Sequence, residues 1–109
     1  MEFSYNQKMA IVKLLLDIIS VDGKIDARET FYFEKVKTSL GLTSQDHFKV
    51  YEYNTLGCLS IIKAMTEEQK EYYAQLMKEM ILADEVVEDN ERIAYDDICK
   101  FCDIKAVDI

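Results

Sequence analysis

The stretch Ser20-Val21-Asp22-Gly23-Lys24-Ile25-Asp26-Ala27-Arg28-Glu29 decides the fold, because it is an acidic loop between two apolar segments with helical spacing. A second stretch, Leu82-Ala83-Asp84-Glu85-Val86-Val87-Glu88-Asp89-Asn90-Glu91, has the same layout. Three acidic positions recur at a constant offset of 62 residues: Asp22, Asp26 and Glu29 in the first stretch, and Asp84, Glu88 and Glu91 in the second. We therefore predict two related helix–loop–helix units, over about residues 8–42 and 70–104, as in an internally duplicated globular domain.

Composition favours helices throughout. The chain has 109 residues, a length typical of one domain, so we expect a single domain over 1–109. It contains no proline and three glycines, whereas sheet proteins need many glycine- and proline-rich turns. Half of the residues are hydrophobic, which argues against a disordered chain. The sequence thus predicts a compact all-α fold of long helices joined by short loops.

Capping residues mark where the helices begin. Ser4 and Thr66 are each followed three residues later by Gln, as in a capping box, while Asp26 and Thr43 precede two further helices. The segment 9–21 is apolar around most of its circumference, which is typical of a central, buried helix. Apolar residues at helical spacing give these predicted buried positions in the later helices: Phe33, Val36, Phe48, Tyr51, Tyr73, Leu76, Met77, Ile93, Ile98 and Phe101.

The net charge of −8 limits the classes of partner. Such a chain repels phosphate backbones and anionic lipid surfaces, so we expect neither nucleic-acid nor membrane binding. Cations and proteins with a basic patch are the natural partners. The first residues lack the positive charge of a signal peptide, and the odd number of cysteines suits a reducing compartment, so we expect a cytoplasmic protein. The sequence leaves the oligomeric state open.

The acidic loops have two interpretations. Asp26 and Glu29 stand where carboxylates cap a helix, which is the stronger interpretation for those two residues. Capping does not explain Asp22 or Asp84, which follow the end of a helix, where negative charge is unfavourable. The alternative is a divalent-cation site, for an ion such as calcium, with one triplet in each loop. Three carboxylates predict weak affinity, on the order of 10⁻⁴–10⁻³ M.

The cysteines form a C-x-x-C sequence at Cys99 and Cys102, with Cys58 elsewhere. A thioredoxin-type motif needs a preceding strand, and a structural zinc site needs a second pair of ligands. We therefore predict thiols packed as small apolar groups. Cys99 corresponds to Lys37 in the first unit, which leaves exposure of Cys99 as an alternative.

The duplicated loop resembles the tellurite-resistance TerB-like family. The resemblance rests on Val21-Asp22-Gly23-Lys24-Ile25-Asp26-Ala27-Arg28-Glu29, on Leu40-Gly41-Leu42, and on the second loop, in which Glu85 replaces glycine. It covers about residues 8–104. The resemblance implies an all-α domain with two long central antiparallel helices, an acidic surface suspected of binding metal ions, and a loose link to bacterial stress responses.

Two functions follow from these features, and neither is enzymatic. The first is an acidic TerB-like module that binds a divalent cation weakly through the two triplets. The alternative is an adaptor that docks a basic partner through the acidic region Glu79–Asp97, which has eight acidic residues and one basic residue. No arrangement of nucleophile and base is visible in the sequence, so we expect that the chain is not an enzyme.

Overall fold

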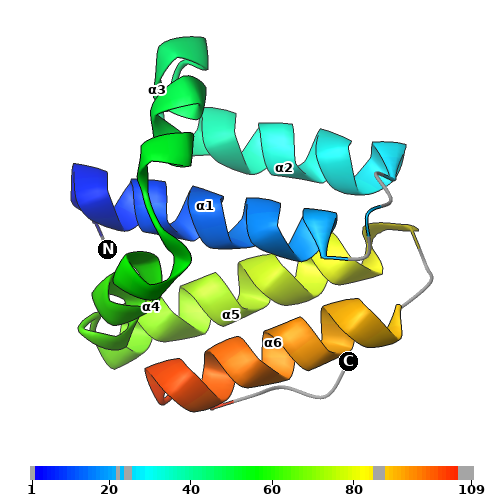
Figure 1. Ribbon diagram of the computed structural model, residues 1–109. Helices are drawn as coiled ribbons and strands as arrows, with labels where there is room; N and C mark the ends of the chain where they lie inside the picture. Colours follow the sequence, from blue (N-terminus) through cyan, green and yellow to red (C-terminus); the bar gives the residue numbers. More distant parts are fainter. Residues whose placement is uncertain (1, 22, 24–25, 85–87, 106–109) are drawn as a thin grey trace.

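A computed structural model describes residues 2–21, 23, 26–84 and 88–105, with the backbone but not the side chain of Asp84. Within these residues all regular structure is helical, which confirms the prediction of an all-α fold (Figure 1). The elements in chain order are α1 (Tyr5–Ser20), α2 (Ala27–Ser39), α3 (Ser44–Lys49), η1 (Val50–Glu52), α4 (Thr55–Lys63), α5 (Glu67–Ile81), η2 (Leu82–Asp84) and α6 (Asp89–Cys102).

Helix α1 is the centre of the fold, as its apolar sequence predicts. It contacts α2, α4, α5 and α6, and in Figure 1 it lies between α2 and α5. Eight of its 16 residues are buried. Lys13 and Asp17 interrupt the apolar surface and form an i,i+4 ion pair with each other. Burial around most of the helix explains why its neighbours are arranged about it.

Helices α2, α4, α5 and α6 each turn one face toward the same hydrophobic core. Their buried apolar residues are spaced by three or four positions, as expected for amphipathic helices. The main contributors are Phe33 and Val36 from α2, Cys58 and Ile62 from α4, Tyr73, Met77 and Met80 from α5, and Tyr95, Ile98 and Cys102 from α6.

The helix starts agree with the predicted caps. Ser4 and Thr66 accept hydrogen bonds from Gln7 and Gln69 backbone amides, and both glutamine side chains accept a bond in return. Such reciprocal bonds satisfy two amides that a helix terminus otherwise leaves without a partner. Thr43 caps α3 in the same way. These local bonds explain why the sequence defines where the helices begin.

Helices α2 and α6 end in similar turns. The Gly41 backbone has φ of 76°, and the Leu42 amide donates to the Lys37 carbonyl at 3.0 Å. At the end of α6, Asp103 has φ of 57°, and the Ile104 amide donates to the Cys99 carbonyl at 2.8 Å. Both are left-handed terminations in which the next amide satisfies a carbonyl of the last turn.

The helix ends follow the offset of 62 residues found in the sequence. From Tyr5 of α1 to Glu67 of α5 the spacing is 62, and it is also 62 from Ala27 of α2 to Asp89 of α6. The left-handed residues Gly41 and Asp103 keep the same spacing. The duplication itself stays a prediction.

The direction of the long helices differs from the prediction. In Figure 1 both α1 and α5 run from left to right, whereas α2 and α6 run from right to left. The antiparallel pairs are therefore α1 with α2 and α5 with α6. The expectation of two antiparallel central helices is wrong, because two helix hairpins placed in the same orientation bring their first helices into the same direction.

Several aromatic residues predicted to be buried are exposed. Phe48 of α3 and Tyr51 of η1 expose 73 % and 65 % of their surface, and α3 has no buried residue. The short segment from α3 to η1 covers the core through Val50 instead. Ile93 and Phe101 of α6 are also exposed, although their spacing predicted burial. None of the described helices has the length and apolar composition needed to cross a bilayer.

Candidate functional site

The predicted loop residues that the structure describes lie at the starts of α2 and α6. The Asp26 carboxylate accepts hydrogen bonds from the backbone amides of Arg28, at 2.8 Å, and Glu29, at 3.3 Å. Asp26 is therefore the N-cap of α2, which confirms the capping interpretation for this residue. Its counterpart Glu88 occupies the N-cap of α6 but is exposed and makes no side-chain capping bond.

Glu29 and Glu91 are the unusual members of the two triplets, because both are buried. Glu29 is 4 % exposed and Glu91 is 1 % exposed, each in the first turn of its helix. The positive end of a helix favours a carboxylate at this position. Charged side chains are rarely buried to this extent. Their equivalent positions are visible in the sequence, but their burial depends on the packing of α2 and α6 and is visible only in the fold.

The described residues on either side of the two acidic loops include segments that contact each other. Helix α2 packs against η2, and in Figure 1 the start of α2 and the end of α5 lie on the same side. Tyr32 of α2 also donates a hydrogen bond to the Glu79 carboxylate of α5. Asp22 lies outside the described residues, as does the side chain of Asp84. The remaining members of the triplets, with the other described residues, form no cluster of three or more potential metal ligands.

A different feature, an apolar groove, lies between α1, α4 and α6. Its volume is about 330 Å³. Three helices far apart in the sequence supply its lining, so no local motif could have predicted it. The lining residues are Leu14, Asp17, Ile18 and Val21 from the α1 side, Thr55 and Leu59 from α4, and Ala94, Asp97, Ile98 and Phe101 from α6. We call this feature the α1/α4/α6 groove.

The charged residues of the α1/α4/α6 groove are both carboxylates. Asp17 pairs with Lys13 and accepts a hydrogen bond from the Thr55 hydroxyl at 2.9 Å, which ties α1 to α4. Asp97 lies on α6, is exposed and takes part in none of the described ion pairs. The lining includes no lysine or arginine among the described residues. The groove is therefore lined mainly by apolar residues, and Asp97 is the lining carboxylate that has no ion pair among the described residues.

Exposed apolar side chains continue this surface beyond the groove. Val21 and Phe101 line the groove and are themselves exposed. Leu56 and Ile93 are also exposed, and they lie three and four positions from the lining residues Leu59 and Asp97, which places each pair on one helix face. Single exposed apolar residues are ordinary, but a group around a concavity is typical of an interaction site.

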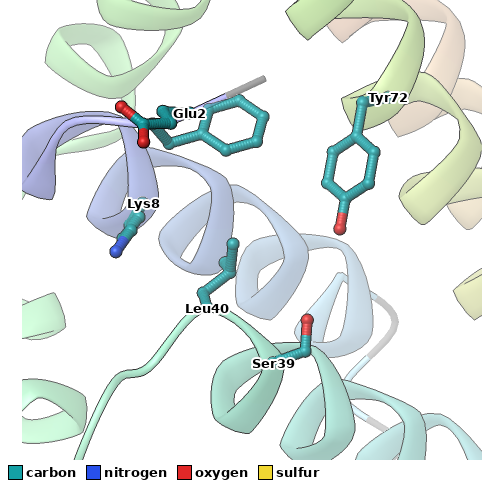
Figure 2. A pocket seen from close by; sticks show the side chains of 6 residues that line it. Glu2, Lys8, Ser39, Leu40 and Tyr72 are labelled. Carbon is teal, nitrogen blue, oxygen red and sulfur yellow. The ribbon is translucent and has the colours of Figure 1, made fainter.

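A second cavity, of about 400 Å³, lies near the start of α1. Figure 2 shows the Tyr72 side chain of α5 across from Ser39 and Leu40 at the end of α2. Glu2 and Lys8 supply charges of opposite sign. The Phe3 and Tyr72 rings pack at 5.5 Å between centroids, so part of this space is closed by the N-terminal segment. The opposite charges give this cavity no preference for a cation or an anion.

The cysteines are buried, as predicted. Cys58, Cys99 and Cys102 are all free thiols in the core, so exposure of Cys99 is excluded. Burial raises the pKa of each thiol to about 11. Because the thiolate is the nucleophile and the metal ligand, the raised pKa disfavours the reactive form of these thiols near neutral pH. The Cys102 thiol donates to the Leu59 carbonyl at 3.4 Å, which fits a packing role.

Comparison with known proteins supports the fold, but it shows neither a family nor a function. No family model matches the chain, and no curated protein matches it. Among solved structures, it is similar to the crystal structure of a protein of unknown function, PG1108, from Porphyromonas gingivalis W83. The TM-score is 0.82 at 22 % sequence identity, over 98 % of this chain and 90 % of that chain. The six-helix arrangement is thus shared with an experimental structure, whereas membership in the TerB-like family stays a prediction.

Proposed function

We propose that the chain is a non-enzymatic interaction module that docks a basic partner protein through the acidic side of α6 and the neighbouring α1/α4/α6 groove. The observation that carries this proposal is the groove itself, whose lining is mainly apolar and includes the carboxylates of Asp17 and Asp97. Apolar contact supplies affinity, and complementary charge guides the encounter and selects the partner.

The exposed acids of α6 support the same proposal. Glu88, Asp89, Asp96 and Asp97 are exposed, and none belongs to an ion pair among the described residues. With a net charge of −8, the chain repels phosphate backbones and acidic surfaces, which argues against nucleic acid or anionic lipid as the partner. Free carboxylates along one helix are instead suited to lysine and arginine side chains.

Charge reversal tests the proposal. The double variant Asp96→Lys with Asp97→Lys should weaken binding of an oligolysine peptide of about ten residues roughly tenfold at low salt, since each exposed pair contributes up to about 1 kcal/mol. Isothermal titration at about 20 mM and about 150 mM NaCl measures the effect, which should shrink at the higher salt because of screening.

The matched control is Glu68→Lys with Glu71→Lys, which changes the net charge equally at exposed positions of α5. It should weaken peptide binding by about twofold or less, because it lies outside the acidic side of α6. Equal losses in the two double variants would mean that the peptide responds only to net charge, and the proposed site would be wrong.

A second candidate function, weak binding of a divalent cation at the acidic loops, is favoured by the burial of Glu29 and Glu91 at equivalent positions. We propose Asp22, Asp26 and Glu29 as the better cluster, and Asp84, Glu88 and Glu91 as the poorer one. The capping bonds of Asp26 leave its second carboxylate oxygen available, because both bonds go to the same atom, Oδ1. Calcium is the first ion to test, since it accepts flexible carboxylate sites.

Calcium at about 1 mM should stabilise the fold by roughly 0.4–1.4 kcal/mol, if the affinity is on the order of 10⁻⁴–10⁻³ M. The melting temperature would then rise by several degrees relative to a sample with chelator. Asp22→Asn should reduce the rise in melting temperature. Matched concentrations of magnesium and of NaCl are the controls, because screening is general to salts whereas ligation depends on the ion. An unchanged melting temperature at millimolar calcium and magnesium would eliminate this candidate.

The resemblance to the TerB-like family fits both candidates, since it implies an acidic surface and a loose link to bacterial stress responses. With either candidate function, we propose that the protein is cytoplasmic. A role in handling tellurite is not proposed, because none of the described features has a chemistry specific to that anion.

A further inference from the structure

We infer that the α1/α4/α6 groove binds one amphipathic helix of its partner, with an apolar stripe in the groove and lysine or arginine on the flanks. This inference rests on the proposed function and specifies the partner segment. It commits to a helix, and the alternatives are an extended peptide, a small apolar molecule and a second copy of this chain.

The shape and lining of the groove favour side chains of a partner over a cofactor. A volume of about 330 Å³ lies at the small end of the roughly 300–1,000 Å³ typical of small-molecule sites. Its interior is formed by aliphatic and aromatic groups such as Leu14, Ile18, Leu59 and Ile98. Small-molecule sites also contain polar groups free to orient the ligand, whereas here the Thr55 hydroxyl and Asp17 are already bonded to each other, which leaves Asp97. Apolar side chains from about two turns of a helix would fill this space.

Backbone hydrogen bonding distinguishes a helix from an extended peptide. An extended segment usually binds by adding a strand to a sheet edge, which pairs its amides and carbonyls. The described part of this chain contains no strand and therefore offers no such edge. A helix satisfies its own backbone and needs only an apolar surface for its stripe, so it can enter a groove between helices.

Charge selects the flanks of the partner helix. Asp17 on α1 and Asp97 on α6 both line the groove, but Asp17 already pairs with Lys13, so Asp97 is the carboxylate that lacks an ion pair among the described residues. Basic residues three or four positions from an apolar anchor lie beside it on a helix surface, where they would meet the exposed Asp97 carboxylate. A second copy of this chain fits poorly, because each copy carries a net charge of −8 and would bring another acidic surface to the groove.

The experiment uses the full chain and a synthetic probe, a Leu/Lys peptide of about 14 residues, which makes about four turns of an amphipathic helix. A scrambled peptide of the same composition has no apolar stripe, and the oligolysine peptide provides charge alone. The Leu/Lys helix should bind at least about tenfold more tightly than either of the other two, because only it fills the groove.

The variant Ala94→Trp places a large ring in the groove from α6, and Ala64→Trp places the same ring at an exposed position at the end of α4. The natural chain has no tryptophan, so each ring is a unique fluorescent reporter of folding and of its surroundings. Ala94→Trp should weaken binding of the Leu/Lys helix roughly 30-fold, as expected when an anchor site is blocked. Ala64→Trp should change it less than about twofold, and neither variant should alter oligolysine binding.

The outcomes separate this inference from the proposed function. The groove inference is wrong if the Leu/Lys helix binds no more tightly than oligolysine, or if Ala94→Trp leaves the affinity for the Leu/Lys helix unchanged. In either case the acidic docking site survives, provided that oligolysine binds. If neither peptide binds, the proposed function fails as well. If Ala94→Trp disturbs folding, the test uses the unsubstituted chain instead and follows its backbone amide NMR shifts as the peptide is added. The Leu/Lys helix should shift amides of α4, α6 and the second half of α1, and shifts centred on α2 or α3 would overturn the inference.

Discussion

Replacing Leu15 with alanine is expected to lower the free energy of unfolding by about 3–4 kcal/mol, within the range of roughly 2–5 kcal/mol found for such changes in well-packed cores. Leu15 has no exposed surface, and it lies on α1, which contacts four other helices. Packing on all sides keeps the structure from collapsing into the space left by the side chain, so a cavity remains. Domains of this size are stable by only about 5–15 kcal/mol, so the loss is a large share of the total.

The same substitution at Leu56 is the control for this prediction. Leu56 is on α4 and 64 % exposed, so Leu56→Ala should change the free energy of unfolding by less than about 0.5 kcal/mol. Denaturant unfolding followed by circular dichroism measures the stability of both variants. The comparison is valid if the unfolding free energy has the same slope against denaturant concentration in each. Similar losses at the two positions would contradict the central role of α1.

The helix starts could be predicted from the sequence because capping is a local interaction. Ser4, Asp26 and Thr66 bond amides two or three residues away, so the signal and its structural effect lie in the same short segment. The burial of α1 could also be predicted, since a segment that is apolar around most of its circumference has no alternative location. The sequence therefore determines the fold class and most helix boundaries.

The exposed faces of the shorter helices could not be predicted in the same way. Spacing shows that Phe48, Tyr51, Ile93 and Phe101 lie on helices, but the choice of buried face depends on how neighbouring elements pack. Helix α3 is six residues long, too short for an apolar stripe to determine its orientation. The consequence for function is direct, because two of these misassigned residues, Ile93 and Phe101, belong to the surface in and around the α1/α4/α6 groove.

The candidate site was predicted only in part for a similar reason. The acidic triplets are visible in the sequence, and the structure gives one member, Asp26, a capping role. The groove joins residues from α1, α4 and α6 that are up to 87 residues apart, from Leu14 to Phe101. Contacts over such separations leave no local pattern, so the groove follows only from tertiary packing.

Replacing Tyr73 with phenylalanine is expected to raise the free energy of unfolding by about 1–2 kcal/mol, because a buried polar group without a hydrogen bond costs roughly 1–3 kcal/mol. Tyr73 of α5 has no exposed surface, and its hydroxyl has no hydrogen-bond partner among the described residues. Burial raises the pKa of this phenol well above its usual value, so the hydroxyl stays neutral. Removing the oxygen keeps the ring and its apolar contacts.

Tyr95→Phe is the matched control, since Tyr95 is also buried but hydrogen-bonds the Cys99 side chain. This substitution should lower the free energy of unfolding by about 1 kcal/mol, the usual net contribution of one hydrogen bond. The same chemical change at two buried tyrosines should thus have opposite signs, which denaturant midpoints at equal slope would reveal. A loss in both variants would mean that a water molecule bonds the Tyr73 hydroxyl in solution, since water is the partner that a buried polar group finds when the protein supplies none.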